Sequence, residues 1–139
     1  MHSSQKNTPS DRTTRVAELK EAVDRFRTER DWKQFHKPKD LGVALVTEVG
    51  ELLEHFRYKS DEGITAYMCD PKNKRDVEHE LADVINLSLL LAIELDIDVS
   101  KAFFDKLEVS AKKYPVHLAK GKASKYTEYK EILMKNLQS

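Results

Sequence analysis

Two pairs of acidic residues recur with the same spacing in this chain of 139 residues. The first pair is Glu48 and Glu51, and the second is Glu80 and Asp83. In each pair the acids are three residues apart inside an apolar-periodic run, so a helix would project both carboxylates from one side. Two such pairs predict one metal site with oxygen ligands.

This site needs two helices that pack as neighbours. Apolar residues at three- and four-residue steps predict one helix over about residues 41–58 and another over about residues 73–95. At 100° per residue, the apolar stripe of each helix lies about 60–80° from the first acid of its pair, with the second acid on the far side. In the second of these helices the predicted inner face comprises Val77, Leu81, Val84, Ser88, Leu91 and Leu95.

Packing the two helices together would bring like charges close to one another. At about 4 Å, each pair of carboxylates would cost on the order of 4 kcal/mol at an effective dielectric of 20, unless a cation neutralises it. Oxygen ligands favour a hard ion, so we expect Mg²⁺, with Mn²⁺ as a substitute. Such an ion polarises a phosphoryl oxygen. The alternative, that the helices are not neighbours and the acids face solvent, stays open on spacing alone.

The overall charge excludes some function classes. There are 24 basic and 24 acidic side chains, and this zero net charge argues against a general nucleic-acid binder. Residues 101–130 nevertheless contain eight lysines and three acids. A basic segment beside an acidic metal centre suits a polyphosphate ligand, although solvated helix faces would give the same pattern.

The sequence predicts a soluble, cytoplasmic, all-α protein without a membrane partner. Cys69 is the only cysteine, and no apolar run approaches a membrane span. No strand-like alternation or glycine-rich phosphate loop occurs. We expect a helical bundle of four main helices, completed by oligomerisation because a small bundle would leave apolar stripes uncovered.

The predicted organisation has three parts. Residues 1–10 form a flexible leader, residues 11–120 a helical domain, and residues 121–139 a basic segment with a short helix at about residues 132–137. Ser10 or Asp11 should cap the first helix, Pro38 should mark a break before a helix capped by Asp40, and Asn73 should open the next helix. A fourth helix is predicted over about residues 99–113.

The chain resembles a known family. The spacing Glu48-x-x-Glu51, twenty-eight residues, then Glu80-x-x-Asp83 resembles the signature of the MazG-like nucleoside triphosphate pyrophosphohydrolases, an all-α superfamily. Residues 29–36, 44–52, 112–119 and 124–128 are similar to conserved blocks of its dCTP pyrophosphatase branch. The resemblance covers roughly residues 15–129, with the blocks in matching order.

This resemblance implies hydrolysis between the α and β phosphates of dCTP, and of 5-modified dCTP, to dCMP and pyrophosphate, as a nucleotide housecleaning activity. It further implies that the two acid pairs hold magnesium and that an acidic side chain acts as the base. Glu51 is the first choice for this base and Glu54 a possible helper. Relatives assemble as homotetramers, usually as dimers of dimers, so we expect the same here.

The resemblance also assigns binding residues. Trp32, His36 and Tyr58 would bind the base, and a tryptophan offers a stacking surface worth about 1–3 kcal/mol. Without the family match, a core-edge position is the preferred explanation of Trp32, and a surface or helix-capping position is the preferred explanation of His36. Tyr58 and Ser110 depart from the tryptophan and asparagine common in relatives. The predicted phosphate contacts are Lys106, Lys113, Lys125 and Tyr126; a basic tail without a fixed role is the alternative for the last two.

Two rival functions come from other classes. A ferritin-like metal bundle would use repeated Glu-x-x-His pairs, but the nearest match here is the single Asp76-x-x-His79. A non-catalytic helical interaction module would explain the amphipathic helices. It would not explain the repeated acids or the aromatic segment ahead of them.

Overall fold

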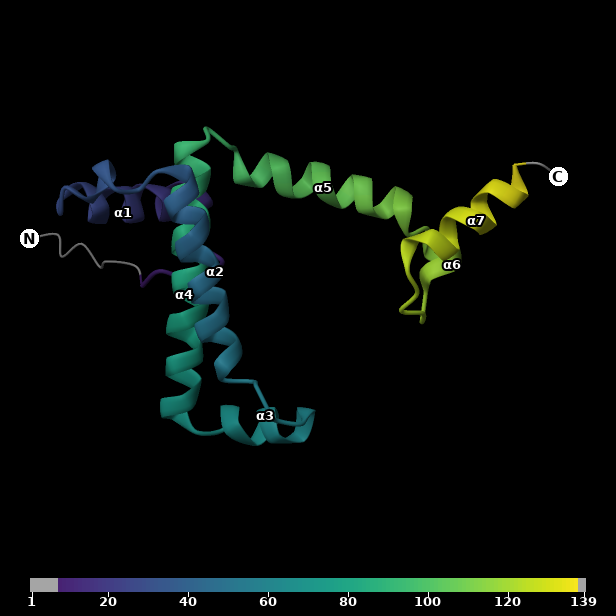
Figure 1. Ribbon diagram of the computed structural model, residues 1–139, viewed down its shortest axis with the longest axis horizontal. Coiled ribbons are helices and arrows are strands. Elements are labelled where there is room, and N and C mark those ends of the chain that lie inside the picture. The colour runs from purple at the N-terminus through teal and green to yellow at the C-terminus, as the bar shows by residue number, and fades with distance from the viewer. Residues whose placement is uncertain (1–7, 138–139) are drawn as a thin grey trace, which may run out of the picture. The chain divides into compact units, whose positions relative to one another are not determined.

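The computed structural model describes residues 8–137, and all the regular elements in this range are helical (Figure 1). They are α1 (Val16–Thr28), the 3₁₀ turn η1 (Trp32–Gln34), α2 (Pro38–Glu54), α3 (Asp61–Met68), α4 (Pro71–Glu94), α5 (Val99–Lys113), α6 (Val116–Ala119) and α7 (Tyr126–Asn136). The predicted all-α class and its four main helices are therefore confirmed. The chain divides into two compact units, with the boundary between Ile97 and Asp98, and the three-part division at residues 10 and 120 stays a prediction.

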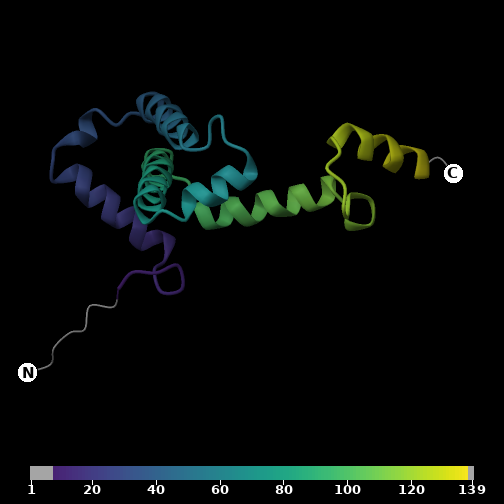
Figure 2. The same cartoon turned by 90° about the horizontal axis from the view of Figure 1, so that it is seen from below.

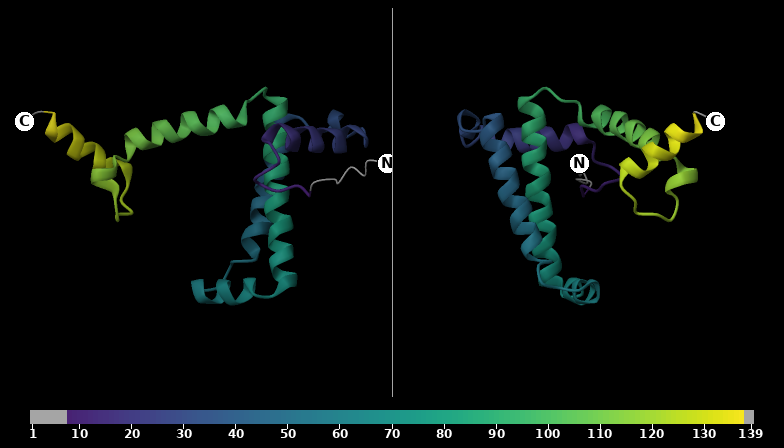
Figure 3. Two further views of the ribbon diagram at one scale, coloured as in Figure 1. Left: turned by 180° about the vertical axis from the view of Figure 1, so that it is seen from behind. Right: turned by 45° about the vertical axis from the view of Figure 1, so that its right-hand side comes forward.

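The first unit is organised around the antiparallel pair α2 and α4, which lie side by side along most of α2 (Figures 1 and 3). Seen nearly end-on, these two helices are flanked by α1, which packs against α4 (Figure 2). The short helix α3 connects them and also contacts α4. The two helices that carry the acid pairs are thus neighbours, as their spacing predicts.

The helices α2 and α4 both begin at a proline. Pro38 was expected to mark a break, but it is the first residue of α2, where its fixed φ suits the helix and its missing N–H is not needed. Asp40 consequently lies in the first turn rather than at the cap. In α4, Asp70 is the cap, and its carboxylate accepts hydrogen bonds from the backbone N–H of Lys72 and of Asn73 (2.7 and 3.2 Å). The predicted start at Asn73 was therefore two residues late.

Other helix ends also differ from the expected positions. Arg15, rather than Ser10 or Asp11, precedes α1, and its backbone N–H donates to the Glu18 carboxylate at 2.7 Å. The chain leaves α2 after Glu54, and Tyr58 has a left-handed φ of 62°. The terminal helix α7 is longer than predicted because it starts at Tyr126 instead of about residue 132.

The core of the first unit lies on more than one side of α4. Val77, Leu89, Leu90 and Ala92 are buried along this helix, together with Leu41 of α2. The predicted inner face of α4 was partly wrong, because Ser88 is exposed and Leu81 and Leu95 are about half exposed (48% and 50%). The reason is that α4 contacts three helices, so one apolar stripe cannot describe its buried surface.

One charged side chain is buried in this core. Arg27 of α1 is fully inaccessible, its Nε donates to Asp24 Oδ1 at 2.7 Å, and its Nη1 lies 2.8 Å from Glu94 Oε1 near the end of α4. A buried guanidinium requires such partners, because an unpaired charge in a protein interior is strongly unfavourable. The ion pair with Glu94 joins α1 to α4.

The outer side of α2 exposes several large apolar residues. Val43, Val46 and Leu53 are more than half exposed and follow a helical spacing. In the second unit, Phe103 and Phe104 of α5 are also exposed, while Tyr114 packs edge-to-face against Tyr126 and Tyr129 of α7. Exposed apolar stripes are consistent with the expected oligomer, which stays a prediction. Among the helices described, none is long and apolar enough to cross a membrane.

Candidate active site

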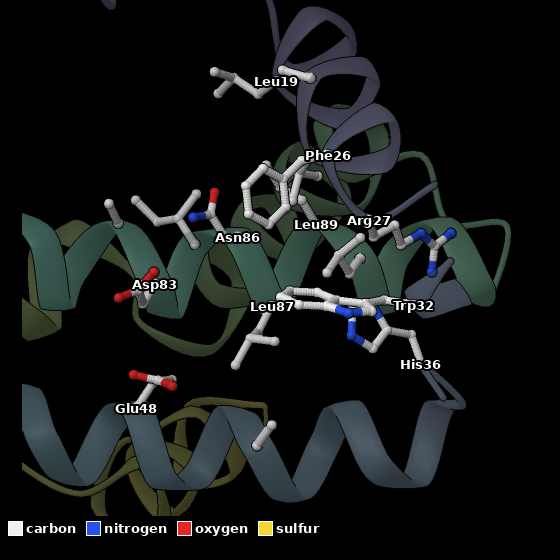
Figure 4. A pocket seen from close by; sticks show the side chains of 16 residues that line it. Leu19, Phe26, Arg27, Trp32, His36, Glu48, Asp83, Asn86, Leu87 and Leu89 are labelled. Carbon is white, nitrogen blue, oxygen red and sulfur yellow. The ribbon is translucent and has the colours of Figure 1, made fainter. Parts of the chain in front are cut away.

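Three of the four predicted metal ligands come together between α2 and α4. Glu48, Glu80 and Asp83 each offer a carboxylate oxygen, and these three oxygens all lie within 4.8 Å of one another. Glu48 and Asp83 face each other across the space between the two helices (Figure 4). We call these three residues the acid cluster. It forms because one helix supplies the first acid and its antiparallel neighbour supplies the other two.

Like charges surround Glu48 in the acid cluster. The pKa of Glu48 is raised above the ordinary value of 4.5, first because the side chain is partly desolvated and then because of the charges of Glu51, Asp83 and Glu80. A carboxylate among like charges gains stability from a bound cation, which compensates the repulsion. The cluster therefore fits a hard divalent ion in both its oxygen donors and its charge.

The acid cluster opens into a cavity of about 670 Å³ in the first unit. Glu48 of α2 and Asp83 of α4 line one part of the cavity, while Trp32 and His36 line another (Figure 4). Most of the remaining lining is aliphatic or aromatic and comes from α1 and α4, including Leu19, Val23, Phe26, Leu89 and Leu90. A mainly apolar cavity with a few polar groups at defined places is typical of a small-molecule site.

The aromatic end of the cavity is built by residues between α1 and α2. The ring of Trp32 stands edge-to-face to Phe26 and to His36, with centroid separations of 5.9 and 6.3 Å. The guanidinium of Arg30 lies 3.7 Å from the centroid of the Phe26 ring on which it stacks. His36 Nδ1 is buried and has no hydrogen-bond partner among the described residues. This end therefore presents an aromatic surface and one polar atom free to bind a ligand.

In the first unit, three predicted site residues lie outside both the acid cluster and the cavity lining. Glu51 is exposed and is not part of the acid cluster, although its charge acts on Glu48. Glu54 is exposed and paired with Arg57, whose Nη1 donates to Glu54 Oε1 at 2.8 Å. Tyr58 is 91% exposed, and the Arg57 guanidinium lies over its ring at 4.7 Å. The roles assigned to these three residues stay predictions.

The predicted phosphate-binding residues belong to the second unit. Lys106 and Lys113 are on α5, Lys125 is the N-cap of α7, and Tyr126 is the first residue of that helix. Lys113 Nζ lies 5.4 Å from the centroid of the Tyr126 ring, so these two residues form a local contact. Their role towards the phosphates stays a prediction.

Sequence reasoning missed Phe26 and Asn86 as cavity residues. Phe26 is on α1, is 48% exposed and lines the cavity. Asn86 follows Asp83 by three residues on α4 and also lines the cavity. Asn86 is three residues after Asp83, a spacing that makes the two side chains neighbours on the helix surface, so a signal for Asn86 was present.

Comparison with known proteins gives the family. The model of the MazG-like family matches residues 43–129, which include all of the acid cluster. The chain belongs to the MazG-like family. The crystal structure of a pyrophosphatase from Archaeoglobus fulgidus is similar to this chain, with 32% sequence identity and a TM-score of 0.68. The match covers 78% of this chain and 99% of that chain.

Curated relatives are also similar to this MazG-like chain. Proteins named dCTP pyrophosphatase 1 from Rattus norvegicus and Homo sapiens are 43% and 40% identical to it over 103 residues. These matches cover 74% of this chain and 61% of each relative. The chain thus spans less than two thirds of the length of these relatives.

Proposed function

We propose that this protein is a metal-dependent nucleoside triphosphate pyrophosphohydrolase that cleaves the α–β phosphoanhydride of dCTP and of 5-modified dCTP. The observation that carries this proposal is that one cavity joins the acid cluster to an aromatic end. A nucleoside triphosphate has the same polarity, with a charged polyphosphate at one end and a flat base at the other. The products would be pyrophosphate and dCMP, or the correspondingly modified dCMP, which fits removal of unwanted nucleotides from the cellular pool.

Glu48, Glu80 and Asp83 would hold Mg²⁺, with Mn²⁺ as a substitute. Bound magnesium would neutralise the charge that develops on the phosphates and lower the pKa of a water molecule. The charge of Glu51 raises the pKa of Glu48, but Glu51 is not part of the acid cluster. It is therefore available either as a fourth ligand or as the general base, and the exposed carboxylate can accept a proton from water. Glu54 is a weaker choice because Arg57 already occupies its carboxylate.

Trp32 and His36 would hold the base at the other end of the cavity. A base stacked on an aromatic ring gains about 1–3 kcal/mol, and this gain is nearly independent of base identity. Discrimination between bases must therefore come from hydrogen bonds, for which the unpartnered Nδ1 of His36 is a candidate. Tyr58 would have to move to reach the base, or would serve a neighbouring protomer.

The basic second unit and the exposed apolar stripe on α2 support two further parts of the proposal. Lys106, Lys113, Lys125 and Tyr126 would contact the phosphates, since ammonium groups bind polyphosphates well. A homotetramer, arranged as a dimer of dimers, would cover the outer side of α2, where Val43, Val46 and Leu53 are exposed.

The test is release of pyrophosphate from each of the eight common nucleoside triphosphates, with magnesium and with EDTA. We expect magnesium-dependent turnover that is fastest with dCTP and that falls at least a hundredfold in Glu48→Gln, Glu80→Gln and Asp83→Asn. Glu78→Gln is the matched control, since Glu78 is exposed on the same helix as Glu80 and outside the acid cluster. Absence of turnover on every nucleotide, or full activity in the three acid variants, would overturn the proposal.

A further inference from the structure

Few polar side chains of the cavity are free to bind an uncharged part of a substrate. Those in the lining are Arg27, Trp32, His36, Glu48, Asp83 and Asn86. Arg27 is occupied by Asp24 and Glu94, and the two acids belong to the acid cluster. Of the remaining three, Asn86 is the one with a carboxamide, which offers an acceptor oxygen and two N–H donors.

Asn86 lies between the two ends of the cavity. It is on the same side of α4 as Asp83, about 4.5 Å further along the helix axis, because three residues rise by that amount. Figure 4 places its amide beside the Phe26 ring, between Asp83 and Leu89, with Trp32 and His36 further along. Among the described residues, no hydrogen bond engages this carboxamide. By contrast, the hydroxyl of Ser88, the next polar side chain on the helix, donates to the Val84 carbonyl.

We infer that the Asn86 carboxamide binds the sugar of the nucleotide through its 3′-hydroxyl. This inference rests on the proposed function, because it needs the phosphates at the acid cluster and the base at Trp32. The sugar connects phosphate to base in every nucleotide, so a side chain one helical turn from the acid cluster towards the aromatic end is opposite the sugar. In a deoxynucleoside triphosphate the 3′-hydroxyl is the only free hydroxyl on that sugar.

The chemistry of a carboxamide suits a hydroxyl group. The amide oxygen accepts the hydroxyl proton, and an amide N–H donates to the hydroxyl oxygen in another orientation. Asn86 is solvent-accessible, and it lines the cavity together with the apolar side chains of Phe26 and Leu89, so a bound sugar can reach its carboxamide. Asn86 would therefore select the sugar, while His36 and the stacking surface of Trp32 act on the base.

The test compares dCTP with 2′,3′-dideoxy-CTP, which lacks the 3′-hydroxyl. For the wild type we expect kcat/KM to be about tenfold higher with dCTP, as expected for loss of one hydrogen bond. In Asn86→Leu this ratio should fall to about one, because turnover of dCTP drops to the level of the dideoxy substrate. The ratio of dCTP to dTTP should stay within twofold of the wild-type value.

Ser88→Leu is the matched control, because Ser88 is exposed on the same helix and outside the cavity lining, and it receives the same new side chain. It should keep the wild-type ratio of kcat/KM for dCTP to that for the dideoxy substrate. The inference is overturned if Asn86→Leu keeps the wild-type ratio of kcat/KM for dCTP to that for the dideoxy substrate. If that ratio is unchanged and the ratio of dCTP to dTTP falls instead, the amide lies at the base and the inference is likewise overturned. Wild-type protein that hydrolyses no nucleotide would overturn the proposed function, and this inference with it.

Discussion

Replacing Glu80 with glutamine should stabilise the metal-free protein, although it removes a predicted metal ligand. Glu80 shares the acid cluster with Glu48 and Asp83, so its negative charge is repelled by two neighbours. Glutamine has nearly the same shape and a similar helix propensity, so the substitution changes little except the charge. The expected gain in stability therefore measures the repulsion that a bound cation would relieve.

The size of this gain follows from the distance between the oxygens. At 4.8 Å one pair of unit charges interacts by about 1 kcal/mol in water and by about 3.5 kcal/mol at an effective dielectric of 20. The lower value applies here because Asp83 is exposed and Glu48 and Glu80 are only half-buried. Removing two repulsions gives a gain of about 1–2 kcal/mol, or roughly 5 °C in Tm.

The assay is thermal and urea unfolding of wild type, Glu80→Gln and the control Glu78→Gln, each in EDTA and in magnesium. The control removes an exposed charge whose partner Lys74 is 4.0 Å away, so its stability should change by less than about 0.5 kcal/mol. Magnesium should stabilise the wild type and the control, as binding to the folded state requires, and should have little effect on Glu80→Gln. The reasoning is refuted if metal-free Glu80→Gln is no more stable than the control, or if magnesium stabilises all three equally.

Three further predictions concern pH, the buried cation and the aromatic end. The pKa of Glu48 is raised in the folded protein, so its protonation favours the fold, and this contribution should be lost as the pH rises above 4.5. In EDTA, Glu48→Gln should therefore become more stable relative to the wild type as the pH rises. A stability difference that does not change with pH would contradict this prediction. Arg27→Met should destabilise the protein by about 1–3 kcal/mol in urea unfolding, since it leaves Asp24 and Glu94, whose side chains are 37% and 19% exposed, without their cation, whereas the exposed Arg25→Met should change stability little. Trp32→Ala should raise KM for dCTP about 5- to 150-fold through lost stacking, with Trp32→Phe close to wild type, and equal KM values in both variants would exclude a stacking role.

The parts of the structure that the sequence predicted well are those set by local helical geometry. The apolar periodicity predicted α2 and α4, and the metal site expected from the two acid pairs required these helices to pack as neighbours, which they do. Helix starts were less predictable because a proline can either interrupt a helix or begin one. At Pro38 and Pro71 the chain uses proline as the first helical residue, which the expected break at Pro38 overlooked.

The cavity was not predictable from any one segment. Its lining combines α1, the turn that carries Trp32, α2 and α4, and the angle at which α1 meets α4 depends on packing and on the buried pair of Arg27 with Glu94. Trp32 and His36 were placed at the site by family resemblance rather than by periodicity. No pattern in their own segment distinguishes a cavity-lining tryptophan from one at the edge of a core.

The position of Asp83 shows how the second side of α4 could have been found. Relative to Glu80, the predicted inner face lies at about 60–70°, which would leave Asp83 at about −60° and turned away from the core. Leu90 follows Asp83 by seven residues and falls about 20° from it on the helix, and Leu90 is only 4% exposed. A buried leucine on the side of an acid means that this side faces protein, so Asp83 and its neighbour Asn86 border a second packed surface. Glu51 has no such partner: Tyr58, seven residues further on, lies beyond the end of α2 and is exposed. This difference explains why Asp83 joins the acid cluster while Glu51 remains at its edge, where a proton acceptor would be accessible to water.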